Sequence, residues 1–233
     1  MRLFSTNCVV GICLCLAGAV TATAQEAVDR LTPAQRAAYR EGGIRAAAAI
    51  TGHFVHLVTA PESVGANLQV LCRVSDLVLV GDVSSLSTRL SDNGMDTQTV
   101  LQVQVQQVLK GSLKPHTVSR VIMAGGKVVF DNGSWAETVL SNEDLPNARF
   151  IRFELPTTGR RYVFFGAQAE SAVIARDRDA LLEVDGDGIL HAHGPKRTFN
   201  ATYDRQPLSV LIRDVEAAIK EPLHKKTAYE SHA

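Results

Sequence analysis

Apolar and polar side chains alternate along residues 99–111, TVLQVQVQQVLKG. Successive side chains of a β-strand point to opposite faces, so this alternation predicts a half-buried strand. The strand ends at Lys110-Gly111, a turn signal. Its buried face would carry Leu101, Val103 and Val105, and its outer face would carry Gln102, Gln104 and Gln106.

Several other segments have the composition of strands. The runs SDLVLVGDVSSLS (75–87), TVSRVIMAGG (117–126) and RRYVFFGAQ (160–168) are rich in β-branched and aromatic residues. Asn132-Gly133 separates two β-prone runs and predicts a hairpin, as does the sequence DGDG at residues 185–188. SDNGMD at residues 91–96 predicts a turn.

Helical patterns flank these strands. Thr32-Pro33 is typical of a helix start, and an alanine-rich stretch follows it, interrupted at Gly42-Gly43. Leu68, Leu71 and Cys72 share one face of a predicted short helix. Residues 207–219 predict an amphipathic helix with apolar positions at Leu208, Leu211, Ile212, Val215 and Ile219.

About six or seven hairpin-connected strands between terminal helices predict an α+β fold. Antiparallel strands at such short spacing favour a small antiparallel β-barrel or a strongly curled sheet, flanked by N- and C-terminal helices.

The first 24 residues have the order of a secretory signal peptide. Arg2 precedes the apolar run CVVGICLCLAGAV, and Ala22 and Ala24 form an A-x-A pattern before Gln25. The alternative is a buried N-terminal helix. We expect cleavage before Gln25, export to a periplasmic or extracellular location, and no transmembrane segment in the remaining chain. We then expect a helical segment over 25–62, a barrel domain with its C-terminal helix over 63–222, and a polar tail over 223–233.

Composition narrows the possible partners. Lys plus Arg equals Asp plus Glu at 24 each, so no net charge attracts nucleic acid, and we expect none as a partner. The expected partner is instead an unidentified protein or another component of the cell envelope. After cleavage Cys72 is the single cysteine, and we interpret it as a small buried apolar residue.

The strand motifs resemble a known pattern. The segments SDLVLVGDV, QQVLKG and GRRYVFFG resemble the order SDLVVxGxV, VLKG and GxxYxxF of uncharacterised bacterial secreted proteins. They are also faintly similar to the netrin-like module of tissue inhibitors of metalloproteinases, an OB-type barrel, over residues 68 to 220. That resemblance implies an OB-type barrel that binds macromolecules. The inhibitory mechanism does not carry over, because that family uses an N-terminal cysteine and disulfides where this chain has Gln25 and Cys72 alone.

Two histidine pairs are candidates for metal binding. His191 and His193 are two residues apart on a predicted strand and would share a face, while His53 and His56 would be neighbours on a helix. The alternative for the first pair is a solvated polar face. Four ligands would come together only if the N-terminal segment folds onto the hairpin.

Other chemistry has weaker signals. Asp185 and Asp187 hint at calcium, but the later acidic ligands of a calcium loop are missing, so a turn explains them better. Arg160 and Arg161 before an aromatic run could stack single-stranded nucleic acid, although we interpret the aromatic residues as core. No nucleophile elbow, zinc-protease motif or nucleotide-binding loop occurs.

Three functional hypotheses remain. The first, which we prefer, is an exported non-enzymatic binding or interaction module without a cofactor or catalytic residues. The second is a metal-binding protein or metal-dependent hydrolase that uses His191, His193, His53 and His56. The third is a structural envelope component that interacts through its terminal helices.

Overall fold

The structure is a computed structural model, and it describes residues 31–59, 67–141, 150–151, 154–170, 172–175, 180–193 and 198–221. The predicted signal peptide and the tail lie outside these ranges. The described chain is α+β, as the pattern predicts. It divides into unit 1 (1–62, 87–100 and 123–155) and unit 2 (63–86, 101–122 and 156–233).

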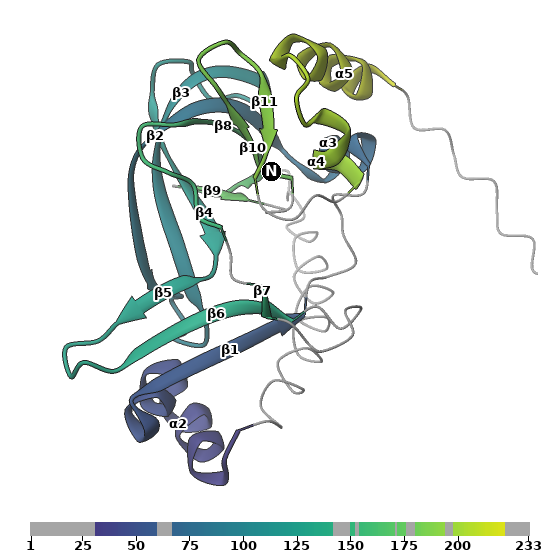
Figure 1. The fold of residues 1–233 in the computed structure, drawn as a ribbon. Coiled ribbons are helices and arrows are strands. Elements are labelled where there is room, and N and C mark those ends of the chain that lie inside the picture. Colours follow the sequence, from purple (N-terminus) through teal and green to yellow (C-terminus); the bar gives the residue numbers. More distant parts are fainter. Residues whose placement is uncertain are drawn as a thin grey trace, which may run out of the picture. The chain divides into compact units, whose positions relative to one another are not determined.

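Unit 1 contains an α-helix and a small sheet. The helix is α2 (Pro33–Thr51), and the sheet has the order β1 (His53–Thr59), β6 (Trp135–Ser141), β5 (Gly126–Val129), with β7 (Phe150–Ile151) also paired to β6. β1 and β6 are parallel, while β5 and β6 form the antiparallel hairpin that Asn132-Gly133 predicts. Figure 1 shows α2 beside β1.

The limits of α2 follow from its sequence. Thr32 and Gln35 form a capping box, and Pro33 occupies the first turn, as the Thr-Pro pair predicts. Gly42 and Gly43 have non-helical backbone angles, which confirms the predicted interruption. A side chain at Gly43 would lie 2.4 Å from the carbonyl oxygen of Gly94, and the positive φ of +67° further favours glycine there.

One face of the small sheet packs against α2. Tyr39, Ile44, Ala47 and Ala48 of the helix form a cluster with Phe54, Ala136 and Phe130. His53 and Val55, the residues on either side of Phe54 in β1, are exposed on the other face of the sheet. Unit 1 therefore has one covered face and one more exposed face of its sheet.

The second sheet contains a closed barrel. Its strands are β2 (Leu77–Leu90), β3 (Thr97–Lys110), β4 (Val118–Ala124), β8 (Arg161–Gln168) and β9 (Val173–Ala175), joined by β10 (Leu182–Val184) and β11 (Leu190–Ala192). The order is β11-β10-β8-β2-β3-β4-β9, and β8 also pairs with β9, so five strands close into a ring. β8 is antiparallel to β2 and β9, whereas β4 and β9 are parallel, so the barrel is mixed rather than wholly antiparallel.

The order of the five barrel strands around the ring differs from their order along the chain. Along the chain they are β2, β3, β4, β8 and β9, and around the ring they follow the order first, second, third, fifth, fourth. The predicted small β-barrel is therefore confirmed, with one parallel pair between its third and fifth strands. Figure 1 shows β2 and β3 as long curved strands of this sheet.

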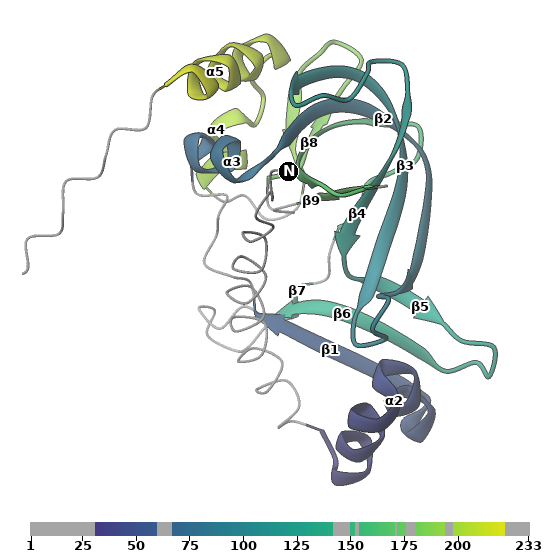
Figure 2. The same ribbon diagram turned by 180° about the vertical axis from the view of Figure 1, so that it is seen from behind.

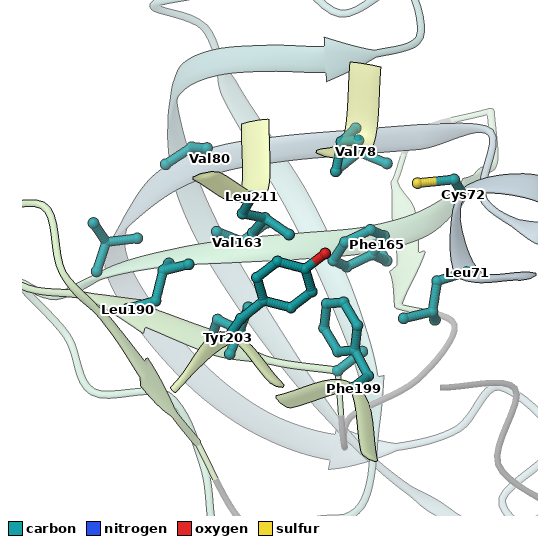
Figure 3. Packing of buried hydrophobic residues seen from close by; sticks show 14 residues of the cluster. Leu71, Cys72, Val78, Val80, Val163, Phe165, Leu190, Phe199, Tyr203 and Leu211 are labelled. Carbon is teal, nitrogen blue, oxygen red and sulfur yellow. The ribbon is translucent and has the colours of Figure 1, made fainter. Parts of the chain in front are cut away.

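In the described ranges, unit 2 also contains helices that pack on its strands. They are α3 (Leu68–Val74), α4 (Thr198–Tyr203) and α5 (Leu208–Lys220), and Figure 2 shows them from behind. Leu211 of α5 is fully buried beside Val163, Phe165 and Phe199 (Figure 3). Val215 of α5 is fully buried in the same cluster. The predicted amphipathic C-terminal helix is therefore part of the core of unit 2.

Candidate functional site

The middle of β3 has the alternation that its sequence predicts. Leu101, Val103 and Val105 are fully buried. Gln102, Gln104 and Gln106 lie on the opposite face and are half-buried. The glutamine amides therefore form a row of neutral hydrogen-bonding groups on the outer wall of the barrel.

An ion pair lies beside this row. The Arg161 guanidinium donates to Asp82 through Nε (2.7 Å to Oδ1) and Nη2 (3.1 Å to Oδ2), and the Gln106 amide donates to the same Oδ2 at 2.7 Å. The hydrogen bond with Asp82 raises the pKa of Arg161. A partly exposed pair of this kind contributes little to stability, but it fixes the positions of three side chains from β8, β2 and β3.

The residues of the VLKG motif have structural roles. Lys110 Nζ donates to the carbonyl oxygens of Cys72 (2.7 Å) and Ser75 (2.6 Å), at the C-terminal end of α3. Gly111 has φ of +101°, and a Cβ there would lie 2.9 Å from the carbonyl oxygen of Asp76. This motif therefore joins β3 to α3 and the start of β2.

Tyr162 of the GxxYxxF pattern is also structural. Its fully buried ring places the hydroxyl where it accepts from the Thr157 N–H (2.9 Å) and donates to Glu183 (3.2 Å). Burial is the main cause of its raised pKa. The described residues of these two motifs thus connect neighbouring elements of unit 2.

His191 and His193 have separate environments. His191 Nε2 lies 2.8 Å from Asp185 Oδ2, and this hydrogen bond is the main cause of the lowered pKa of Asp185. His193 is buried, with its ring edge-on to Tyr162 at a centroid distance of 5.3 Å. The sequence predicts both side chains on one face, but His191 is exposed to solvent and His193 is buried. The two histidines also have different neighbours.

The prediction for His53 and His56 was wrong in its local structure. The helix ends at Thr51, and residues 53–59 form a strand, so residues three apart point to opposite faces. His53 is exposed and stacks on Trp135 at 5.4 Å between ring centroids. His56 is 4% exposed, and its Nδ1 lies 2.8 Å from Asp96 Oδ1.

No three His, Cys, Asp or Glu side chains in the described ranges come together in a way that could hold a metal ion.

Asp185 Oδ1 accepts from the N–H groups of Asp187 and Ile189, which are the contacts of a turn. The Asp185 carboxylate therefore closes the β10–β11 turn, and Asp187 contributes its backbone N–H.

Cys72 is buried, as its sequence context predicts. It is 2% exposed, and desolvation raises its pKa to about 11. A thiol in this state is mainly protonated at neutral pH and is a poor nucleophile.

Sequence reasoning missed Asp82 and Trp135. Asp82 interrupts the apolar run of β2 and could have indicated an outward-facing position with an oppositely charged neighbour. Trp135 is the single tryptophan, and the Lys127 ammonium lies 4.2 Å from its ring centroid on the exposed face of the small sheet.

Comparison with known proteins gives no assignment: no protein-family model matches the chain, and no curated protein matches it. None of the helices in the described ranges has both the length and the apolar character needed to cross a membrane.

Proposed function

We propose that this protein is an exported, non-enzymatic binding module. The observation that carries the proposal is the outer wall of β3, where Gln102, Gln104 and Gln106 are half-exposed beside the Asp82–Arg161 pair. OB-type barrels bind their ligands on the outer face around the second and third strands, which correspond here to β3 and β4. The location of the glutamine row supports binding at this wall.

The chemistry of the wall favours an uncharged polar partner. Glutamine amides both donate and accept hydrogen bonds, and the neighbouring Arg161 charge is paired with Asp82. The balanced composition provides no field that would attract nucleic acid. A protein or a polysaccharide of the cell envelope fits these groups, and the predicted signal peptide would deliver the protein to that compartment.

A catalytic role has no comparable support. The four histidines of the metal hypothesis have individual partners or are stacked on aromatic rings. The proposal therefore assigns no cofactor and no catalytic residue.

Replacement of Gln102, Gln104 and Gln106 by lysine tests the proposal. The side chains point away from the barrel interior, so we expect the unfolding temperature to change little, while three added charges remove binding to an uncharged partner. The partner would first be identified by photo-crosslinking from position 104 in living cells. Affinity for that partner would then be measured with purified variants, and we expect a loss of about tenfold or more.

A matched control adds the same charge elsewhere on unit 2. Ala201, Ser209 and Ala217 are exposed on α4 and α5, and their triple lysine variant should retain full affinity. Equal affinity of both triple variants would exclude the β3 wall. Intact mass of the protein from the exported fraction tests export separately, since cleavage predicts a chain that begins at Gln25.

A further inference from the structure

β1 is an edge strand in the described part of the chain. It pairs with β6 alone, and the parallel register opposes His53 to Trp135. The Trp135 N–H donates to the Gly52 carbonyl, so the even-numbered residues of β1 direct their backbone groups toward β6. The N–H and C=O groups of Val55 and Leu57 therefore point away from the sheet.

β11 and β5, which also lie at sheet edges, receive hydrogen bonds from other segments in the described ranges. At β11, the Leu190 N–H donates to Gln206 and the Leu190 carbonyl accepts from Arg205. At β5, the Gly126 and Lys127 carbonyls accept from the hydroxyls of Thr97 and Thr88. Within the described ranges β1 has one such contact, from the Thr51 hydroxyl to the His53 carbonyl at its first residue.

β1 also lacks the features that keep an edge strand from pairing. Its sequence HFVHLVT contains no proline, lysine, arginine or carboxylate. Val55, in its centre, is 36% exposed. Unpaired backbone groups on an uncharged strand are a template for another extended strand.

We propose that β1 pairs with β1 of a second copy of this chain in an antiparallel arrangement about a two-fold axis. With the axis at His56, Val55 faces the partner's Leu57, and Leu57 faces the partner's Val55. Both pairs would exchange their two backbone hydrogen bonds, because these residues already direct those groups outward. The small sheets of both copies would then join into one continuous sheet.

The self-complementarity of β1 is the reason to prefer a second copy over another peptide. The two-fold arrangement places Val55 opposite the partner's Leu57 and His56 opposite the partner's His56, and it brings no lysine, arginine or carboxylate of β1 together. A contact between two short strands buries less area than a standard stable interface. We therefore expect a reversible dimer that depends on protein concentration. This proposal concerns unit 1 and does not depend on the function proposed for the β3 wall.

Sedimentation velocity across a concentration series tests the dimer. Val55→Lys would place two ammonium groups near the axis and should weaken association about tenfold or more. Val129→Lys is the matched control, because Val129 is a 67% exposed valine on β5 of the same sheet. We expect the control to associate like the wild-type protein, and thermal unfolding shows whether each variant remains folded.

Amide hydrogen exchange gives a second readout at the same strand. In concentrated protein the Val55 and Leu57 amides should exchange more slowly than in dilute protein, while the Phe54 and His56 amides, which already face β6, should not change. A protein that stays monomeric at high concentration would overturn the proposal. Slow exchange of Val55 and Leu57 in dilute monomer, or loss of association in Val129→Lys alone, would also overturn it.

Discussion

At the scale of single residues, burial determines the chemistry of Cys72. Its thiol pKa rises from 9.0 to about 11 because the folded chain desolvates it. A folded pKa above the unfolded value means that the folded state holds the proton more tightly. The associated stabilisation is therefore complete below pH 9 and is lost as pH rises toward 11.

We predict that Cys72→Ala reduces this alkaline loss of stability. Between pH 8 and pH 11 the free energy of unfolding of the wild-type protein should fall by about 1–2 kcal/mol more than that of the variant. Urea unfolding at both pH values measures the difference, on chains that begin at Gln25. Tyr39, whose pKa is raised to about 12, is present in both proteins and cancels in the comparison. The charge of Cys72 is one cause of the raised pKa of Tyr203, so this interaction is part of the measured difference. Identical pH dependence would show that Cys72 ionises normally in the folded state.

The sequence predicts the environment of a single residue correctly where that environment depends only on whether the side chain is buried. Cys72 is buried because its neighbours on the predicted helix face are apolar, a pattern visible in the sequence. The partners of His56 were not predictable, because Asp96 comes from a turn distant in sequence and Tyr39 from α2. Such contacts depend on how α2, β1 and the turn at residues 91–96 pack together.

At the scale of elements, the end of a strand stabilises the end of a helix. Lys110, the last residue of β3, donates to two carbonyl oxygens at the C-terminal end of α3. Cations are favourable at helix C-termini, and hydrogen bonds from charged donors are stronger than neutral ones. Lys110 therefore links two elements that are separated by the whole β2–β3 hairpin.

We predict that Lys110→Met lowers the free energy of unfolding by about 1–3 kcal/mol, because the two carbonyl oxygens lose their charged donor. Lys114→Met is the control: Lys114 is exposed in the same connection between β3 and β4, and its replacement should change stability by less than about 0.5 kcal/mol. Urea unfolding at neutral pH compares the two variants. Equal stability of both would mean that the Lys110 contacts contribute nothing in solution.

Elements with a clear local pattern were predictable from sequence, whereas β1 and β9 were not. β3 alternates over many residues, and α5 has apolar positions at helical spacing. β1 directly follows an alanine-rich helix, and the buried His56 interrupts the apolar alternation on its covered face. The sequence pattern of this segment therefore favours a helix over a strand. β9 has three residues and is defined by pairing with β4 and β8 rather than by its own pattern.

At the scale of the whole chain, the sequence predicts a small barrel but not the order in which its five strands pair. The parallel pairing of β4 with β9 joins residues about 50 positions apart, and no local pattern specifies it. The interior is instead specified locally, by the apolar face of each strand. Sequence thus predicts which side chains are buried more directly than it predicts the partner of each strand.

The C-terminal helix provides the last prediction, which separates a core element from an appendage. Leu211 and Val215 of α5 are fully buried in a cluster with Phe199, Tyr203 and Leu71. A chain that ends before Pro207 exposes this cluster, and loss of several large buried side chains costs more than the typical stability of a domain. We therefore expect the shortened chain to lose cooperative thermal unfolding, as followed by circular dichroism.

A chain that ends at Glu221 is the control for this truncation. It retains every residue of the cluster, together with the hydrogen bond from Gln69 to Glu221, and should unfold like the full protein. If the chain that ends before Pro207 remained a folded monomer, α5 would not be required for the core, and its apolar face would be available to a partner. Comparison of the two truncations thus distinguishes the role of α5 in folding from a role in binding.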